Sequence, residues 1–216
     1  GYAFSPDSRE LCFTSNRDPV PATSTNSDLW VVPVEGEAPA SPRNMTAGNR
    51  GWDGDPVYSP DGRWIAYLSQ ETPGNEADLF RVAIVDRTTG DARYLTTRES
   101  FDDWVTALAW LPNGRELLFQ AELKGRTPLY RVDVGGGEIR QVATDGAIAG
   151  WRVTPQGDAV VYTRSQVGAP PEVFRVAVDG GSPEQITTFN DQLASEVDIR
   201  PAQELWVKGA GDYNVH

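Results

Sequence analysis

A proline-centred turn between two short apolar strands recurs along this chain and limits its fold more than any other feature. The clearest copy is VYSPDGRWIAYLS, beginning at Val57. Pro60 presets φ for the second turn position, Asp61 suits the third, and Gly62 can take the left-handed conformation that closes such hairpins. Further copies are FSPDSRELCFTS at Phe4, WLPNGRELLFQA at Trp110, VTPQGDAVVYTR at Val153 and, more faintly, IRPAQELWVKG at Ile199. Each copy predicts a β-hairpin.

Two more elements follow each clear hairpin in a constant order. The first is an aromatic strand: DLWVVPV at Asp28, DLFRVAIVD at Asp78, PLYRVDVGGG at Pro128 and EVFRVAVDGG at Glu172. The second is a short strand ending in Thr: RNMT at Arg43, RYLTT at Arg93, RQVAT at Arg140 and EQITT at Glu184. Four antiparallel strands in roughly 40 to 50 residues make one blade of a β-propeller. The alternative, a β-sandwich with similar turns, does not account for four ordered copies.

The repeats predict an all-β chain of about four four-stranded antiparallel blades. The expected blades span about 1–48, 49–98, 99–146 and 147–194, and 195–216 would hold a last propeller strand and the start of a linker. Four blades of this size do not close easily around an axis, and an open propeller leaves sheet edges unpaired. We therefore expect a partial propeller and a longer parent protein.

Composition excludes several classes of protein. The net charge of −12 and the lack of a basic patch argue against a nucleic-acid partner. No apolar run is long enough to cross a membrane, and no long segment has helical periodicity. The 21 Gly and 16 Pro residues separate short strands and act as turn residues. The single cysteine, Cys12, lies in an apolar strand and is expected to be a buried core residue.

No catalytic chemistry is visible in the sequence. A Ser-His-Asp triad needs an imidazole, and the only histidine is His216 at the end of the chain. No G-x-S-x-G elbow occurs, since the nearest segment, Gly180–Glu184, lacks the final glycine. One His and one Cys cannot form a zinc site, and the WDGDP and FDDW segments do not match the calcium loop with its closing Glu. We expect no cofactor.

The repeats nevertheless carry a family resemblance. The SPDG hairpin followed by an aromatic DLF strand resembles the TolB-type propeller repeat. More specifically, GYAFSPDSRELCFTSNRDPVPATSTNSDLWVVPV is similar to a blade of the prolyl oligopeptidase family of serine peptidases, nearest to its acylaminoacyl and dipeptidyl peptidases. The segments TFND and ELWVKGAGDYNVH agree with the propeller exit in that family. The resemblance covers essentially the whole chain, but the triad serine, aspartate and histidine have no counterpart in it.

The resemblance implies a non-catalytic role in a peptidase. In such a parent the propeller caps the active site of a C-terminal α/β-hydrolase domain, limits substrates to short peptides and orients them. Expected partners are therefore peptide substrates, the parent's own hydrolase domain and, as an open alternative, a second copy in a homo-oligomer. A TolB-like propeller that binds protein partners is the other hypothesis. Peptide specificity and localisation, cytoplasmic or periplasmic, are left open by the sequence.

Aromatic and acidic residues near the starts of the innermost strands are the candidate substrate contacts. These residues are Trp52, Asp53, Asp55, Asp102, Asp103, Trp104, Trp151 and Glu196. One interpretation is a rim that receives a peptide and its amine. The other, which we favour because blades commonly carry a large aromatic there, is that the tryptophans pack between blades and the carboxylates cap turns. Arg81, Arg131 and Arg175 recur in the third strands and are expected to be structural.

Overall fold

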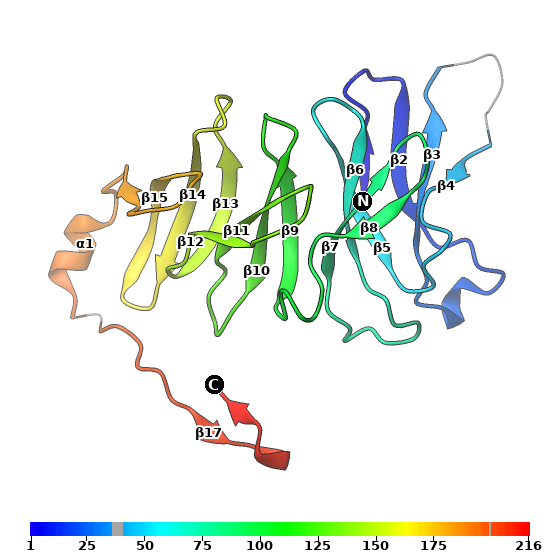
Figure 1. The fold of residues 1–216 in the computed structure, drawn as a ribbon. Helices are drawn as coiled ribbons and strands as arrows, with labels where there is room; N and C mark the ends of the chain where they lie inside the picture. The colour runs from blue at the N-terminus through cyan, green and yellow to red at the C-terminus, as the bar shows by residue number, and fades with distance from the viewer. Residues whose placement is uncertain (36–40, 199) are drawn as a thin grey trace. The chain divides into compact units, whose positions relative to one another are not determined.

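Four four-stranded sheets follow one another along the chain in the computed structural model, which describes residues 1–35, 41–198 and 200–216 (Figure 1). The first sheet contains β1 (Tyr2–Phe4), β2 (Glu10–Ser15), β3 (Asp28–Pro33) and β4 (Arg43–Asn44). The second contains β5 (Asp53–Tyr58), β6 (Trp64–Ser69), β7 (Arg81–Asp86) and β8 (Ala92–Tyr94). The third contains β9 (Trp104–Trp110), β10 (Glu116–Glu122), β11 (Leu129–Asp133) and β12 (Arg140–Ala143). The fourth contains β13 (Ala147–Val153), β14 (Ala159–Gln166), β15 (Ala169–Ala177) and β16 (Glu184–Gln185).

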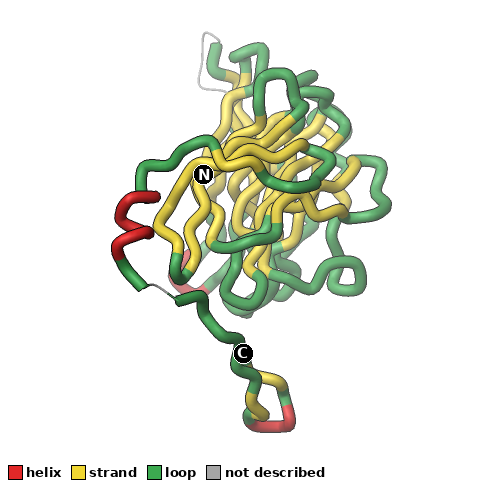
Figure 2. Tube along the Cα trace, turned by 90° about the vertical axis from the view of Figure 1, so that its left-hand side faces the viewer, coloured by secondary structure: helices red, strands yellow, loops and turns green. Residues whose placement is uncertain are grey.

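Strand order within each sheet is the order along the chain, and pairing is antiparallel throughout the first, second and fourth sheets. Strands and connecting loops make up most of the chain (Figure 2). None of the described helices could span a membrane. The predicted all-β class of four-stranded antiparallel blades is confirmed.

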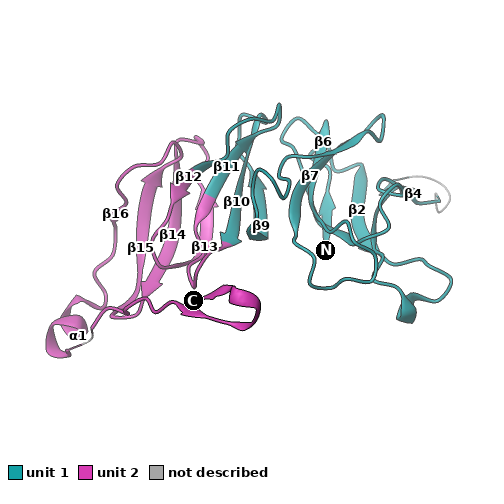
Figure 3. Cartoon of the chain, turned by 60° about the horizontal axis from the view of Figure 1, so that its bottom comes forward, with its two compact units in different colours: residues 1–121, 130–140 teal, residues 122–129, 141–216 magenta. Residues whose placement is uncertain are grey.

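The chain divides into two compact units (Figure 3). Unit 1 comprises residues 1–121 and 130–140, and unit 2 comprises residues 122–129 and 141–216. The first and second sheets lie wholly in unit 1 and the fourth wholly in unit 2, whereas residues of the third sheet belong to both.

Each of the four clear proline turns joins the first and second strands of its sheet, as the repeats predict. In the second sheet the Ser59 hydroxyl donates to Asp61 (2.5 Å) and accepts from the Trp64 amide (2.9 Å). The amide of Gly62, at φ +70°, donates to the Ser59 carbonyl (2.8 Å) and completes the turn. The turn is therefore specified locally, by a hydroxyl, a carboxylate and a residue that tolerates positive φ.

The first turn departs from this pattern because Ser8 occupies the left-handed position, at φ +59°, where the later turns have glycine. A side chain in that conformation costs about 1 kcal/mol. We expect Ser8→Gly to raise the free energy of unfolding by about 0.5 kcal/mol, after the extra chain entropy of glycine is subtracted. Urea unfolding of the two proteins measures the difference. The reciprocal change, Gly62→Ser, should destabilise the chain, and a loss of stability in Ser8→Gly would contradict the assignment of strain.

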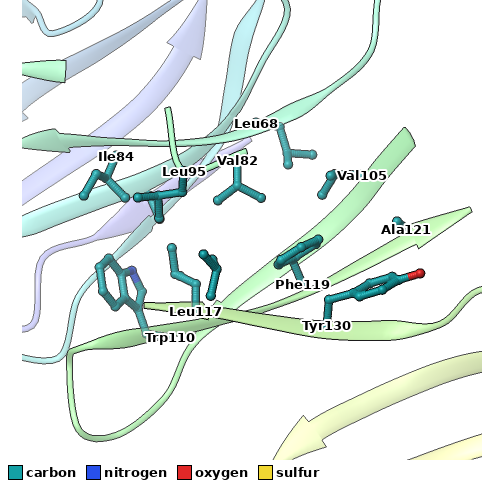
Figure 4. Packing of buried hydrophobic residues seen from close by; sticks show 12 residues of the cluster. Leu68, Val82, Ile84, Leu95, Val105, Trp110, Leu117, Phe119, Ala121 and Tyr130 are labelled. Carbon is teal, nitrogen blue, oxygen red and sulfur yellow. The ribbon is translucent and has the colours of Figure 1, made fainter. Parts of the chain in front are cut away.

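Apolar side chains of the second and third sheets form the main core of unit 1 (Figure 4). Val82, Val105 and Leu117 are completely buried there. The ring of Phe119, also inaccessible, stacks on Tyr130 with centroids 5.5 Å apart. A second cluster between the first and second sheets includes Cys12, which is fully buried as expected. Burial raises the pKa of this thiol to about 12, so it is not a reactive nucleophile.

The region after residue 190 differs from the predicted fifth hairpin. Residues 191–196 form α1 (Asp191–Glu196), and the short strands β17 (Val207–Lys208) and β18 (Asn214–Val215) pair with each other. The predicted fifth hairpin was wrong. Each of the other four turns carries at least one Asp, Asn or Gly within the two positions after its proline, whereas the fifth, Pro201-Ala-Gln, carries none. The start of that copy, Ile199, lies outside the described residues. Two single-turn 3₁₀ helices, Pro21–Thr23 and Ala210–Asp212, complete the secondary structure described.

Candidate functional site

Three aromatic side chains form a row in unit 1 beside the starts of β5 and β9. Trp52 meets Phe80 edge to face with centroids 5.0 Å apart, and Phe80 meets Trp104 in the same way at 5.1 Å. Both tryptophans are half-buried. Trp52 lies directly over Gly54, where an added Cβ would stand 2.2 Å from the indole ring, so only glycine fits at that position. The row is a packed element that also leaves part of each indole accessible.

Two of the predicted acidic residues, Asp55 and Asp102, are exposed to solvent and lie close to Trp52 and Trp104 in the sequence. Asp102 precedes Trp104 by two residues. Asp55 follows Trp52 by three residues and lies in a β-bulge of β5 between Gly54 and Val57, at φ +52°. Bulges turn a side chain out of the regular pleat, and a non-glycine residue at positive φ is strained. Asp103, in contrast, is half-buried and engaged in a contact of its own.

Asp53 does not lie on an open rim, because its side chain is completely buried. Its Oδ1 atom accepts hydrogen bonds from the Ser69 hydroxyl (2.6 Å) and from the side-chain amide Nδ2 of Asn49 (2.9 Å). Burial raises the pKa of Asp53 to about 6, against the lowering effect of these two donors. This residue is therefore part of the interior and not of an exposed rim.

Two residues of unit 2 also differ from their predicted places. Trp151 was expected at a strand start, but it lies well inside β13 and is only 8% exposed. Its strand begins earlier, at Ala147, and bulges at Gly150 (φ +55°). Glu196 was expected at the start of an innermost strand, but it is the exposed last residue of α1 and accepts from Gln192 (3.0 Å). The first of these two is a core side chain, and the second sits on a helix.

The recurrent arginines pair with carboxylates, in keeping with a structural role. Arg131 lies 3.4 Å from Glu116, and Arg175 lies 2.9 Å from Asp158. Buried Arg81 contacts Asp78 and Glu71, each at 3.4 Å. Sequence reasoning missed Asp78, which is buried and accepts the backbone amides of residues 71, 72 and 79, all at 2.9 Å. The sequence feature that could have indicated Asp78 is its place at the start of the aromatic segment DLFRVAIVD.

No arrangement for nucleophilic or metal catalysis is present among the residues described. His216 is exposed, and its ring stacks on Trp206 at 4.5 Å. Within the part of the chain that the structure covers, no three His, Cys, Asp or Glu side chains gather as a metal site. What the aromatic row and exposed carboxylates can offer is a binding surface for a chain with a cationic end.

Comparison with known proteins gives these features a context. No protein-family profile matches the chain. Dipeptidyl-peptidase 5 of Porphyromonas gingivalis is 27% identical over 209 residues, covering 96% of this chain and 30% of that protein. The enzyme of the same name from Porphyromonas endodontalis is 30% identical over 208 residues, covering 95% of this chain and 29% of that protein. This chain is similar in sequence to part of dipeptidyl-peptidase 5. The predicted resemblance to serine peptidases of the prolyl oligopeptidase family is confirmed, and the chain spans about 30% of the length of these relatives.

Solved structures agree on the fold of this chain. A mutant puromycin hydrolase matches with a TM-score of 0.69 at 20% identity, covering 100% of this chain and 32% of that one. A putative TolB from Agrobacterium tumefaciens matches with a TM-score of 0.63 at 22% identity, covering 85% and 63%. Acylaminoacyl peptidase of Pyrococcus horikoshii matches with a TM-score of 0.59 at 14% identity, covering 83% of this chain and 31% of that one. At such identities these likenesses establish the propeller fold alone.

Proposed function

We propose that this chain is the non-catalytic β-propeller part of a serine exopeptidase of the dipeptidyl peptidase type. In this role it admits short peptides and orients them for an α/β-hydrolase domain elsewhere in the parent protein. The observation that carries the proposal is the match to dipeptidyl-peptidase 5, which takes in 96% of this chain and only 30% of the relative. Such a division of labour needs no catalytic residue in the propeller, since exclusion and positioning act through shape.

Exposed apolar side chains in unit 2 support a partner domain. They gather between residues 186 and 215, and the most exposed are Phe189 (85%), Tyr213 (76%) and Leu205 (73%). Large apolar side chains grouped on a surface mark an interaction face. A hydrolase domain packed on this segment would cover these side chains.

The aromatic row and the exposed carboxylates of unit 1 would provide the substrate contact. Trp52 and Trp104 offer partly accessible rings, and Asp55 and Asp102 offer negative charge for a peptide amine. A protonated amine is attracted both by carboxylates and by the faces of indole rings. The chain's net charge of −12 adds a general attraction for cationic peptide ends.

Activity measurements on the chain and on its full-length gene product test the proposal. The full-length protein should release dipeptides from amino-terminal reporter substrates and react with a serine-directed fluorophosphonate. The chain of 216 residues should do neither, because it contains no elbow serine and no buried histidine. Stoichiometric labelling of the isolated chain would refute its non-catalytic assignment. A full-length protein without peptidase activity that captures a protein partner would favour the TolB-like binding module.

A further inference from the structure

An isolated parallel bridge in unit 1 brings two buried carboxylates together. Ser27 pairs with Trp52, and the Asp53 amide donates to the Ser27 carbonyl (2.8 Å). Asp28 and Asp53 each follow a residue of this bridge. They are therefore neighbours on adjacent strands, whose backbones lie about 5 Å apart. Their exposed fractions are only 6% and 0%. One belongs to the first sheet and the other to the second, so the pair lies where these sheets meet.

This pair lacks a counter-charge from the protein. Among the ion pairs of the described residues, none involves either carboxylate. Asp53 has its two donors on Oδ1, whereas its Oδ2 atom is buried without a partner. The Oδ1 atom of Asp28 is likewise buried and unpartnered. Two adjacent buried carboxylates with free oxygen atoms are costly unless a positive species neutralises them.

Neutral oxygen atoms complete the surroundings. Burial raises the pKa of both carboxyl groups, and contacts with Thr46 act in the opposite direction on both, so this hydroxyl lies within reach of each. The side-chain amides of Asn44 and Asn26 also donate to Asp28 and lower its pKa, while the Oδ1 atom of Asn26 is a third buried oxygen without a donor. A single shared proton could satisfy two of these three acceptors at most. A cation bound by several oxygens could satisfy all of them.

A cavity lies next to the neighbours of this pair. It has a volume of about 730 Å³ in unit 1, and its lining includes Thr46, Asn49 and Tyr94 together with Arg50 and Arg93, but neither Asp28 nor Asp53. The first two contact the carboxylate pair, and the Tyr94 hydroxyl lies 3.1 Å from the Ser69 hydroxyl that donates to Asp53. The side chains of Thr46 and Asn49 therefore separate the pair from this cavity, and water in the cavity lies one side chain away from the carboxylates.

We propose that Asp28 and Asp53 bind a calcium ion, with the Thr46 hydroxyl and the Asn26 carbonyl oxygen as neutral ligands. Carboxylates, amide oxygens and water are the ligands that Ca²⁺ takes, in flexible geometry, whereas Mg²⁺ demands near-ideal octahedra and loses water reluctantly. Two carboxylates match the charge of one divalent ion. The ion would join the first and second sheets at their bridge and would stabilise unit 1.

Terbium luminescence and thermal unfolding test the calcium site. Tb³⁺ substitutes for Ca²⁺ and is excited by nearby aromatic rings, and Trp52 is adjacent to Asp53. The metal-stripped chain at pH 7.5 should show sensitised Tb³⁺ emission that Ca²⁺ displaces and Mg²⁺ does not. Calcium at about a hundred times its Kd should raise Tm by about 5 to 10 °C.

Variants locate the effect. Asp53→Asn and Asp28→Asn should each weaken Ca²⁺ binding by more than about tenfold, whereas the control Asp145→Asn, at an exposed carboxylate of unit 2, should leave it unchanged. Circular dichroism checks that each variant is folded, and the terbium competition in the unaltered chain does not depend on any variant. The site is overturned if the unaltered chain shows no calcium-dependent emission or Tm shift, or if Asp53→Asn binds as tightly. A Tm that responds to pH and not to Ca²⁺ would show a shared proton in place of the ion, which also overturns it.

Discussion

Replacing Asp78 by alanine should lower the free energy of unfolding of the chain by about 3 to 5 kcal/mol, the cost of breaking a buried ion pair from one side. The carboxylate is buried and holds the loop before β7 through the Glu71 and Thr72 amides. Among the described residues, its removal also leaves the Arg81 guanidinium, 6% exposed, with the half-exposed Glu71 as its remaining ion-pair partner and the Leu79 carbonyl as a hydrogen-bond acceptor. Urea unfolding followed by tryptophan fluorescence measures the loss.

The pH dependence of stability gives this prediction a second measurement. Burial alone would raise the pKa of Asp78, but the Thr72 and Glu71 amides and Arg81 outweigh it and hold the pKa at about 2, below the value of 3.8 in an unfolded chain. A carboxyl whose pKa is lower in the folded state stabilises the fold above about pH 4, and this stabilisation disappears as the pH falls towards about 2. It is worth about 2 kcal/mol. Asp78→Asn should lose that share of stability at neutral pH and flatten the acid limb of the stability curve.

A matched control separates this pair from general effects of charge. Asp91→Asn removes an exposed carboxylate from the hairpin of the same sheet and should change stability by less than about 0.5 kcal/mol. If Asp78→Ala unfolds at the same urea concentration as the unaltered chain, the buried pair does not support the loop and the assignment is wrong.

The blades could be predicted from the sequence because their signals are local. Pro60, Asp61 and Gly62 act within one turn, so three consecutive residues suffice to place a hairpin. Register within a blade is less local. The Thr46 hydroxyl accepts the Leu29 amide, but its counterpart Thr96 accepts the Val82 amide, three residues beyond the position that a DLW-to-DLF alignment gives. The strand β3 begins at Asp28 itself, whereas β7 begins three residues after Asp78, a difference that sequence similarity does not reveal.

The candidate site was predicted only in part, for a similar reason. Trp52, Trp104, Asp55 and Asp102 could be found because they flank strand starts. The burial of Asp53 depends on the bridge between Ser27 and Trp52, residues that are far apart in the sequence and that no periodic pattern connects. A bulge moved the strand start away from Trp151, and helix α1 replaced a predicted strand at Glu196. Pairing between segments, rather than residue type, decided the outcomes for Asp53 and Trp151.

Under the proposed function, removing the charges of Asp55 and Asp102 should weaken substrate binding by the full-length protein without slowing its chemistry. Asp55→Asn and Asp102→Asn together keep the shape of two exposed side chains and abolish two charges that would attract a peptide amine. We expect KM for a dipeptidyl reporter to rise by about tenfold at low salt, the scale of an ion pair near a surface, with kcat nearly unchanged.

The salt dependence and a control variant decide what these two carboxylates do. Because they are exposed, the rise in KM should shrink as ionic strength increases. Asp91→Asn, which removes the same charge from a hairpin of the same sheet, should leave KM unaltered. Unchanged kinetics together with a lower Tm in the Asp55→Asn, Asp102→Asn protein would mean that the carboxylates support their turns, and the aromatic row would then be an element of packing alone. An effect on KM that persists in high salt would instead place the carboxylates in direct, desolvated contact with the substrate, because only buried charges escape screening.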